Sequence, residues 1–231
     1  MADFINSYLF GIYPYIALTV LVIGSIIRYD REPYSWRSSS SQILRRGQLM
    51  AGSILFHVGV LIVFLGHLVG LLTPIEFFDW VGISHPFKQI TAIAVGGVAG
   101  IISFVGATLL AHRRLFDPRI RANSSFADTA IILLLWLQLA LGLSTIVISV
   151  EHLDGAEMIR FMAWAQGILT FDAMAASYIL NAHWIYKLHI FLGLTLFLIF
   201  PFTRLVHMLS APVRYLWRSG YQITRSKKAA L

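Results

Sequence analysis

The sequence predicts an all-α integral membrane protein, a bundle of five transmembrane helices. Of its 231 residues, 58% are hydrophobic and only 13% are charged, whereas a soluble domain carries about 25% charged residues. The mean hydropathy is +0.74, and the apolar residues gather in stretches of the length that a bilayer requires. We expect one membrane domain over residues 1–231, with spans at about 8–27, 48–72, 89–111, 126–150 and 183–208 and a basic tail at 209–231.

Local signals support the ends of these spans. Pro14 lies near the start of the first span, where a proline is tolerated, and the pair Thr73-Pro74 ends the second. The third span is rich in glycine and alanine, which let helices approach closely in lipid. Between the fourth and fifth spans, the stretch AEMIRFMAWAQGIL (residues 156–169) is predicted to form an amphipathic helix that lies on the membrane. Pro201 predicts a kink in the fifth span.

Positive charge is distributed asymmetrically among the loops. The loop after the first span holds five lysines and arginines, the loop after the third span four, and the chain from Arg204 onward six, which is fifteen of eighteen. Only Lys88, Arg160 and Lys187 fall on the other side. Because cytoplasmic loops are enriched in lysine and arginine, we expect a cell inner-membrane protein with its N-terminus outside and its C-terminus in the cytoplasm. The net charge of +7 then needs no nucleic-acid partner.

The absence of two sequence features narrows the classes of protein further. The chain has no cysteine, which excludes disulfides, cysteine-ligated iron–sulfur clusters and covalently attached c-type haem. The N-terminus has no basic segment, and the first apolar run has no small-residue cleavage site. We therefore expect the first span to be retained rather than removed as a signal peptide.

Four histidines lie within two of the apolar spans. His57 and His67 are in the second span, and His189 and His207 are in the fifth. Ionisable side chains inside a membrane are costly and indicate function. With a helical rise of about 1.5 Å per residue, the first two histidines lie roughly 15 Å apart and the last two roughly 27 Å apart. On antiparallel spans, His57 is then level with His207, and His67 with His189.

Two imidazoles on facing helices are the axial ligands that a low-spin b-type haem requires. The sequence therefore predicts two non-covalent haems at different depths. Zinc or copper is disfavoured, because the spans offer no further cysteine, carboxylate or clustered histidine. His183 is a rival to His189, but it falls at a span boundary. Three other histidines sit in loops or at edges, namely His85, His112 and His152.

Small and cationic side chains near the histidines could complete the haem sites. Gly59, Gly66 and Gly70 in the second span leave space for a flat macrocycle. On the expected topology, His57 and His207 lie towards the cytoplasm, and we call the haem between them the inner haem. Arg37 or Arg204 could supply the positive charge for its propionates.

Two long stretches of the sequence resemble one known protein family. The stretch FHVGVLIVFLGH followed by LLTP, and the later stretch KLHIFLGLTLFLIFPFTRLVH, resemble the gamma subunit of membrane-bound respiratory nitrate reductase, a di-haem cytochrome b. The resemblance covers about residues 12–215, and its motifs keep the same order. The shorter motifs that match are IYPYI, RYD, WRSSSSQ, RRLFDPRIRA, HLDG and WAQ.

The resemblance implies a role in electron transport. His57 and His207 match the ligands of the family's inner haem, and His67 and His189 match those of the outer haem. The subunit is expected to oxidise a quinol at the outer face and to pass electrons through both haems to a cytoplasmic iron–sulfur beta subunit. A molybdenum alpha subunit then reduces nitrate to nitrite.

The resemblance also implies a quinol site near the outer haem. Lys88 matches the family's quinol-site lysine, and Gly66, beside His67, leaves room for a flat ligand. The quinol is menaquinol or ubiquinol. The loop from Thr73 to Pro86 differs in detail from the family pattern, which leaves the quinone type open.

Three other functions remain open at this stage. A related cytochrome b subunit could serve another membrane redox complex with a different terminal acceptor. The four histidines could form the relay of a proton or ion transporter, although such folds usually show inverted repeats and discontinuous helices. A haem-free anchor for soluble subunits is the third alternative.

Overall fold

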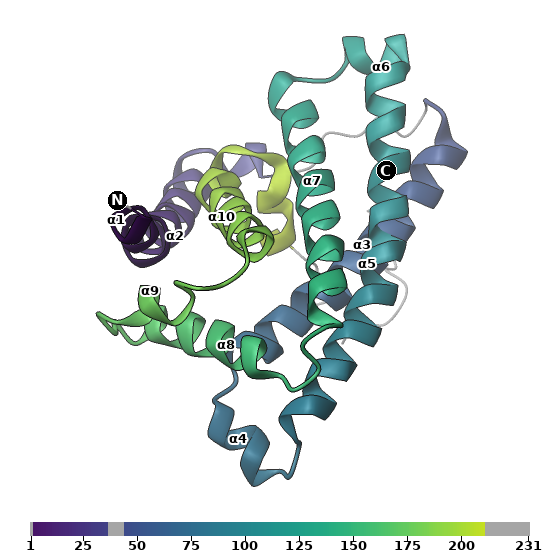
Figure 1. Cartoon of the computed structure of the whole chain (residues 1–231). Coiled ribbons are helices and arrows are strands. Elements are labelled where there is room, and N and C mark those ends of the chain that lie inside the picture. The colour runs from purple at the N-terminus through teal and green to yellow at the C-terminus, as the bar shows by residue number, and fades with distance from the viewer. Residues whose placement is uncertain (1, 37–43, 211–231) are drawn as a thin grey trace, which may run out of the picture.

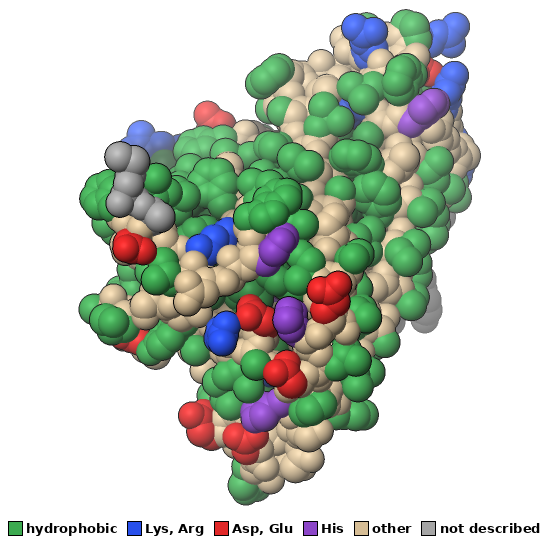
Figure 2. Space-filling view, viewed as in Figure 1, with side chains coloured by type: hydrophobic (Ala, Val, Ile, Leu, Met, Phe, Trp, Pro, Cys, Tyr) green, Lys and Arg blue, Asp and Glu red, His purple; other side chains and the backbone are tan. Residues whose placement is uncertain are grey.

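The computed structural model describes residues 2–36 and 44–210, and the regular elements in those ranges are all helical. Five helices in this part of the chain have the length and apolarity that crossing a membrane requires, which confirms the predicted fold class. Figure 2 shows hydrophobic side chains over much of the visible face, with lysine and arginine side chains at its upper right and several carboxylates and histidines over its lower half. The five membrane-length segments are Asp3–Arg31, Arg46–Leu72, His85–Phe116, Phe126–Ser149 and Trp184–Phe202.

Short helical elements connect the long ones (Figure 1). The first segment combines helix α1, a π-helical turn η1 and helix α2, and the fifth combines α10 with the 3₁₀ turn η3. In chain order the elements are α1 (Ala2–Ser7), η1 (Tyr8–Ile12), α2 (Tyr13–Arg31), η2 (Pro33–Ser35), α3 (Arg46–Leu72), α4 (Ile75–Trp80), α5 (His85–Phe116), α6 (Pro118–Ala122), α7 (Phe126–Ser149), α8 (Ala156–Leu169), α9 (Ala175–Tyr178), α10 (Trp184–Ile199), η3 (Phe200–Phe202) and η4 (Arg204–Ser210).

The starts of α5 and α7 are set by side chains that cap them. The Ser84 hydroxyl accepts a hydrogen bond from the backbone N–H of Phe87 at the start of α5. Ser125 and Asp128 form a reciprocal capping box at the start of α7. Such caps satisfy backbone N–H groups that have no partner in the first turn of a helix, so both long helices begin at defined residues.

Close packing joins α3 to α5 along most of their length. Glycines make this possible: a Cβ at Gly106 would overlap the backbone N of Phe56, and one at Gly59 would overlap the carbonyl oxygen of Ala99. Small residues let membrane helices approach in this way. The expectation that Gly59 faces a macrocycle is wrong, because Gly59 is buried against α5.

Helix α10 packs between α2 and α7, as Figure 1 shows. The predicted helix over residues 156–169 is present as α8 (Ala156–Leu169). One side of it is buried in an apolar cluster with η1, α9 and α10, to which Phe10, Trp164, Ile168 and Leu194 contribute. Helix α8 is therefore part of the packed bundle rather than only a surface helix.

The fifth span differs from the expected helix over 183–208. Helix α10 ends at Ile199, and the chain continues through η3 into the separate 3₁₀ segment η4, which carries His207. Pro201 explains the break, because proline has no N–H to donate and its ring clashes with the carbonyl four residues earlier. His189 and His207 therefore lie on different elements.

Candidate functional site: two imidazole pairs

The four histidines of the apolar spans lie in two pairs. The rings of His57 on α3 and His207 on η4 have centroids 6.2 Å apart. The rings of His67 on α3 and His189 on α10 have centroids 6.1 Å apart. We call these the inner pair and the outer pair. The structure thus brings together the same residues that the depth argument matched, at two levels of the bundle.

Three of the four rings are oriented by backbone carbonyls. Nδ1 of His57 lies 2.7 Å from the carbonyl oxygen of Ser53, and Nδ1 of His67 lies 2.8 Å from that of Val63. Nδ1 of His207 contacts the carbonyl oxygen of Arg204. A carbonyl on Nδ1 fixes the tautomer and leaves Nε2 with its lone pair available for a ligand.

His189 has a different environment. Its Nδ1 is buried and has no hydrogen-bond partner among the described residues. Its Nε2 lies 3.4 Å from the side-chain nitrogen of Gln138, which also donates to the backbone carbonyl of His189. Gly142 leaves the space that the ring occupies. Buried polar atoms nearly always have a partner, so the ring of His189 has a nitrogen that could accept a group not supplied by the described chain.

The distances within both pairs fit a metal centre between the rings. Metal–imidazole bonds are about 2 Å long, so two rings on opposite sides of one metal ion have centroids about 6 Å apart. Within residues 2–36 and 44–210, no group of three or more histidine, cysteine, aspartate or glutamate side chains could hold a metal ion. Each pair thus offers two imidazoles, the number of axial ligands that a low-spin haem takes.

Lys88 lies one helical turn from the outer pair. Its Nζ donates to the carbonyl oxygen of Gly70, which follows His67 by three residues on α3. The same Nζ lies 2.8 Å from Sδ of Met162 and 3.6 Å from the centroid of the Phe78 ring. Beside the carbonyl oxygen of Gly70, the contacts of this ammonium are a thioether sulfur and an aromatic ring face. Both are weaker acceptors than an oxygen, so an incoming oxygen could take their place.

Open space surrounds Gly66 on α3. No side chain or backbone atom outside its own helix lies within 4 Å of a Cβ built there, and the same holds for Gly70. The residue is exposed, as is the neighbouring His67. The described chain therefore leaves room beside the outer pair for a flat molecule.

Two arginines, Arg37 and Arg204, were expected to bind the propionates of the inner haem, and the structure describes only Arg204. Arg204 is bound to a carboxylate of this chain, with both Nε and Nη2 lying 2.7 Å from Oδ1 of Asp128. A propionate at this position would have to share the guanidinium with Asp128. Arg37 lies outside the described residues.

The side chains of three of the four remaining histidines have local partners. His183 caps α10, because its Nδ1 accepts a hydrogen bond from the backbone N–H of Ile185. His85 lies 3.5 Å from a carboxylate oxygen of Asp79, and His112 stacks on Phe116 at the end of α5. None of these three belongs to the inner or the outer pair.

Sequence reasoning missed the supporting residues Gln138 and Gly142 on α7. Both contact His189, yet each is one ordinary residue in a long apolar helix. The only available signal was that Gln138 is a polar side chain within the fourth span, where polar groups are rare and functional.

Five membrane-length helices and two imidazole pairs at different depths define a class, a helical membrane protein with two paired-histidine sites. Comparisons with known proteins narrow that class to a family. The family described as nitrate reductase gamma subunit matches residues 6–227. The chain is 46% identical to the respiratory nitrate reductase 1 gamma chain of Escherichia coli, over 97% of this chain and 99% of that one.

Two further relatives agree. Identity is 43% to the respiratory nitrate reductase 2 gamma chain of Escherichia coli, over 99% of this chain and 100% of that one. It is 37% to the nitrate reductase gamma chain of Bacillus subtilis, over 95% and 97%. The chain belongs to the nitrate reductase gamma subunit family, the membrane subunits of a multi-subunit oxidoreductase.

Proposed function

We propose that this chain is the di-haem b, quinol-oxidising membrane subunit of a respiratory nitrate reductase. Electrons from a quinol, menaquinol or ubiquinol, enter at the outer face and leave at the cytoplasmic face. There an iron–sulfur beta subunit receives them, and a molybdenum alpha subunit reduces nitrate to nitrite. Family membership supports the complex, and the site geometry supports the role of this subunit within it.

The observation that carries the proposal is the arrangement of the two imidazole pairs. His57 and His207 would hold an inner haem, and His67 and His189 an outer haem, each through one imidazole nitrogen. A bis-imidazole b haem supplies one-electron redox chemistry without binding substrate at iron. The protein's own contribution is to fix the imidazoles at two depths and to exclude water from the apolar spans between them.

The quinol site is proposed beside the outer pair. The Lys88 ammonium would donate a hydrogen bond to a quinone oxygen, and the open surface at Gly66 would admit the ring. As two electrons leave the quinol, its two hydroxyl protons would be released to the outer side. Charge would then move across the membrane although no proton passes through the protein.

The orientation proposed is N-terminus outside and C-terminus in the cytoplasm of a bacterial inner membrane. Several arginines lie near the inner pair and near the segments that lead to it, including Arg28, Arg114 and Arg204. Fifteen of the eighteen lysines and arginines fall on this side of the predicted topology. Cytoplasmic loops carry such an excess, and the basic side would face the soluble subunits.

The test is a spectroscopic haem count on the purified complex. A dithionite-reduced minus oxidised spectrum with a pyridine haemochrome assay should give two b haems per chain. His67→Ala and His57→Ala should each remove one of them, whereas His112→Ala, at the exposed end of α5, should remove none. A folded complex without haem would contradict the proposal and favour a histidine-relay transporter or a haem-free anchor.

A further inference from the structure

The segment that carries His207 is not held by a continuous helix. Helix α10 ends at Ile199, and residues Arg204–Ser210 form the separate 3₁₀ segment η4. Short 3₁₀ runs have weaker hydrogen-bond geometry than an α-helix. By contrast, both residues of the outer pair lie within long α-helices. Something other than helix propagation must therefore fix the position of the His207 ring.

Arg28 at the end of α2 provides one attachment. Its Nη1 donates to the carbonyl oxygens of Pro201 at 2.6 Å and of Thr203 at 2.8 Å. Its Nε and Nη2 donate to the hydroxyl and the carbonyl of Ser35. Where the helix breaks, carbonyls lose their usual N–H partners, and one guanidinium here binds two of them. Arg28 thereby ties the start of η4 to α2.

Asp128 provides the second attachment, from α7. Its Oδ1 accepts from Nε and Nη2 of Arg204, both at 2.7 Å, and its Oδ2 lies 3.5 Å from Nη1 of Arg114 on α5. The Asp128 side chain is only 15% exposed, and the capping box with Ser125 fixes its position. Charge-assisted contacts of this kind are shorter and stronger than neutral ones.

The chain of contacts leads directly to the imidazole. Arg204, whose side chain is held by Asp128, presents its backbone carbonyl to Nδ1 of His207. The path from the α7 carboxylate to the ring is therefore Asp128, Arg204, His207. A shift of Arg204 would rotate or release the ring that faces His57.

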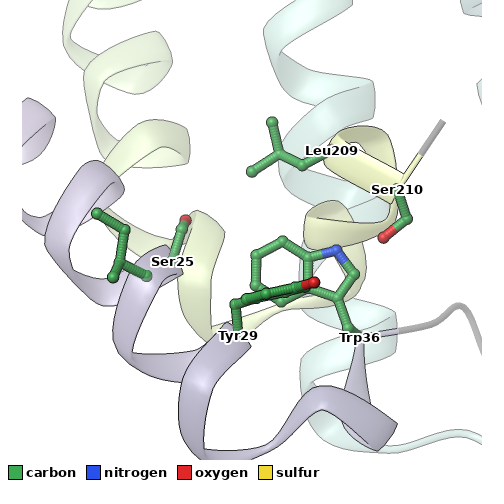
Figure 3. Close-up of a pocket in the computed structure, with 6 residues that line it drawn as sticks. Ser25, Tyr29, Trp36, Leu209 and Ser210 are labelled. Atoms are coloured by element: carbon green, nitrogen blue, oxygen red, sulfur yellow. The ribbon is translucent and has the colours of Figure 1, made fainter. Parts of the chain in front are cut away.

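Apolar packing also holds η4. Leu205 and Val206 are buried in an apolar cluster with Ile131 and Phe200. On the other side, within the described part of the chain, residues 209 and 210 border a cavity of about 550 Å³ that also faces α2. Figure 3 shows this cavity, with Tyr29 and Trp36 opposite the end of η4. Apolar packing at Leu205 and Val206 and the polar contacts of Arg28 and Arg204 thus act together on this segment.

We infer that Asp128 and Arg28 are positioning residues of the inner imidazole pair, and that the outer pair does not depend on them. The inference rests on the proposed function, because it assigns these residues to the inner haem site. Neither side chain belongs to the imidazole pairs themselves. Their effect passes through Arg204 and through the carbonyls of Pro201 and Thr203.

The test compares haem signals in the complete membrane complex. Asp128→Asn and Arg28→Gln are the test variants. The matched controls are Asp30→Asn and Arg31→Gln, which change exposed side chains of the same kinds at the end of α2. The readouts are haem content, the midpoint potential of each haem by redox titration, and the low-spin electron paramagnetic resonance signal of each haem. The variants His57→Ala and His67→Ala assign the signals to the inner and the outer site.

The expected result is selective. In Asp128→Asn and Arg28→Gln the inner signal should be lost or its potential displaced, and the haem content should fall from two per chain towards one. The outer signal should keep its wild-type potential, and both controls should match the wild type. If the inner signal keeps its potential and line shape in both test variants, the inference is wrong although the proposed function stands.

Two further outcomes are decisive. A wild-type complex without two haems would overturn the proposed function and this inference with it. If Asp128→Asn loses both signals, Asp128→Glu distinguishes a local effect on the inner site from a general loss of folding. This variant keeps the charge but carries it on a longer side chain. A displaced inner potential beside an unchanged outer one in that variant supports the inference, whereas equal loss of both signals overturns it.

Discussion

Gly142 of α7 lies directly against the imidazole of His189 on α10: a Cβ added at Gly142 would be 3.1 Å from Cε1 of that ring. Gly193 on α10 has a similar relation to Gln138, whose side-chain nitrogen would be 3.2 Å from an added Cβ. The absence of a side chain at these positions therefore shapes the space around the outer pair. Both distances are short enough that a methyl group would force its neighbour to move.

Gly142→Ala should therefore displace the His189 ring without removing it. Overfilling a packed site costs about 1–3 kcal/mol, and the strain would fall on the ring and on Gln138. We expect the midpoint potential of the outer haem to shift while that of the inner haem stays unchanged, as measured by redox titration. Gly96→Ala is the control, because a Cβ there meets no atom within 4 Å. Identical titrations for both variants would contradict this account.

Gly106→Ala should separate α3 from α5. The added methyl would overlap the backbone N of Phe56 and would lie 2.8 Å from the carbonyl oxygen of Gly52. Backbone atoms cannot rotate away as a side chain can, so we expect a loss of about 1–3 kcal/mol of stability or more. Thermal unfolding of the detergent-solubilised complex should show a lower Tm than Gly96→Ala. Because Phe56 precedes His57, the inner haem signal should weaken too.

The sequence was sufficient for the long-range features that follow simple periodic rules. Apolar length predicts the five membrane-length segments, and the order of the four histidines on two antiparallel spans predicts which of them pair. The continuous helical rise assumed from 189 to 207 was wrong, because α10 ends at Ile199. The predicted start of the fourth segment at about residue 126 agrees with the structure, in which α7 begins at Phe126. Apolar length and the spacing of histidines are read along one segment at a time, so a single sequence is enough to detect them.

The features that sequence reasoning missed depend on distant parts of the chain. Pro201 predicted a kink, whereas α10 ends completely at Ile199. The carbonyl oxygen of Pro201 beyond that end is bound by Arg28, which precedes it by 173 residues. Gly59, Gly66 and Gly70 look equivalent in the sequence, but Gly59 is buried against α5 while the other two face open space. Hydropathy cannot separate these cases, because helix rotation is set by packing with neighbouring helices.

Trp164→Phe should destabilise the packing of α8 against η1. The indole Nε1 of Trp164, a buried side chain, donates at 2.9 Å to the carbonyl oxygen of Phe10 in the π-helical turn η1. Phenylalanine keeps most of the apolar contact but leaves that carbonyl without its donor, at a cost of about 1–3 kcal/mol. The measurement is Tm in detergent. Trp184→Phe, at a tryptophan that is 63% exposed, should leave Tm unchanged, and equal effects of the two variants would argue against the role of the hydrogen bond.

Lys88→Met should reduce quinol oxidation while leaving both haems in place. The substitution keeps an apolar side chain of similar length against Phe78 and Met162 but removes the ammonium. A hydrogen bond from a charged group is worth about 1.5–3 kcal/mol, which corresponds to roughly 10- to 100-fold in kcat/KM for the quinol. Haem content should stay at the wild-type value, because Lys88 is not a member of either imidazole pair.

Lys187→Met is the matched control for that measurement. Lys187 lies on α10, on the same side of the predicted topology as Lys88, and its Nζ also donates to a backbone carbonyl, that of Leu180. If the lysine charge on this side acted only through general electrostatics, both variants would lower quinol oxidation alike. A large loss in Lys88→Met alone, with steady-state rates measured over a range of quinol concentrations, would assign the effect to the space beside the outer pair. Unchanged kcat/KM in Lys88→Met would remove this lysine from the quinol site.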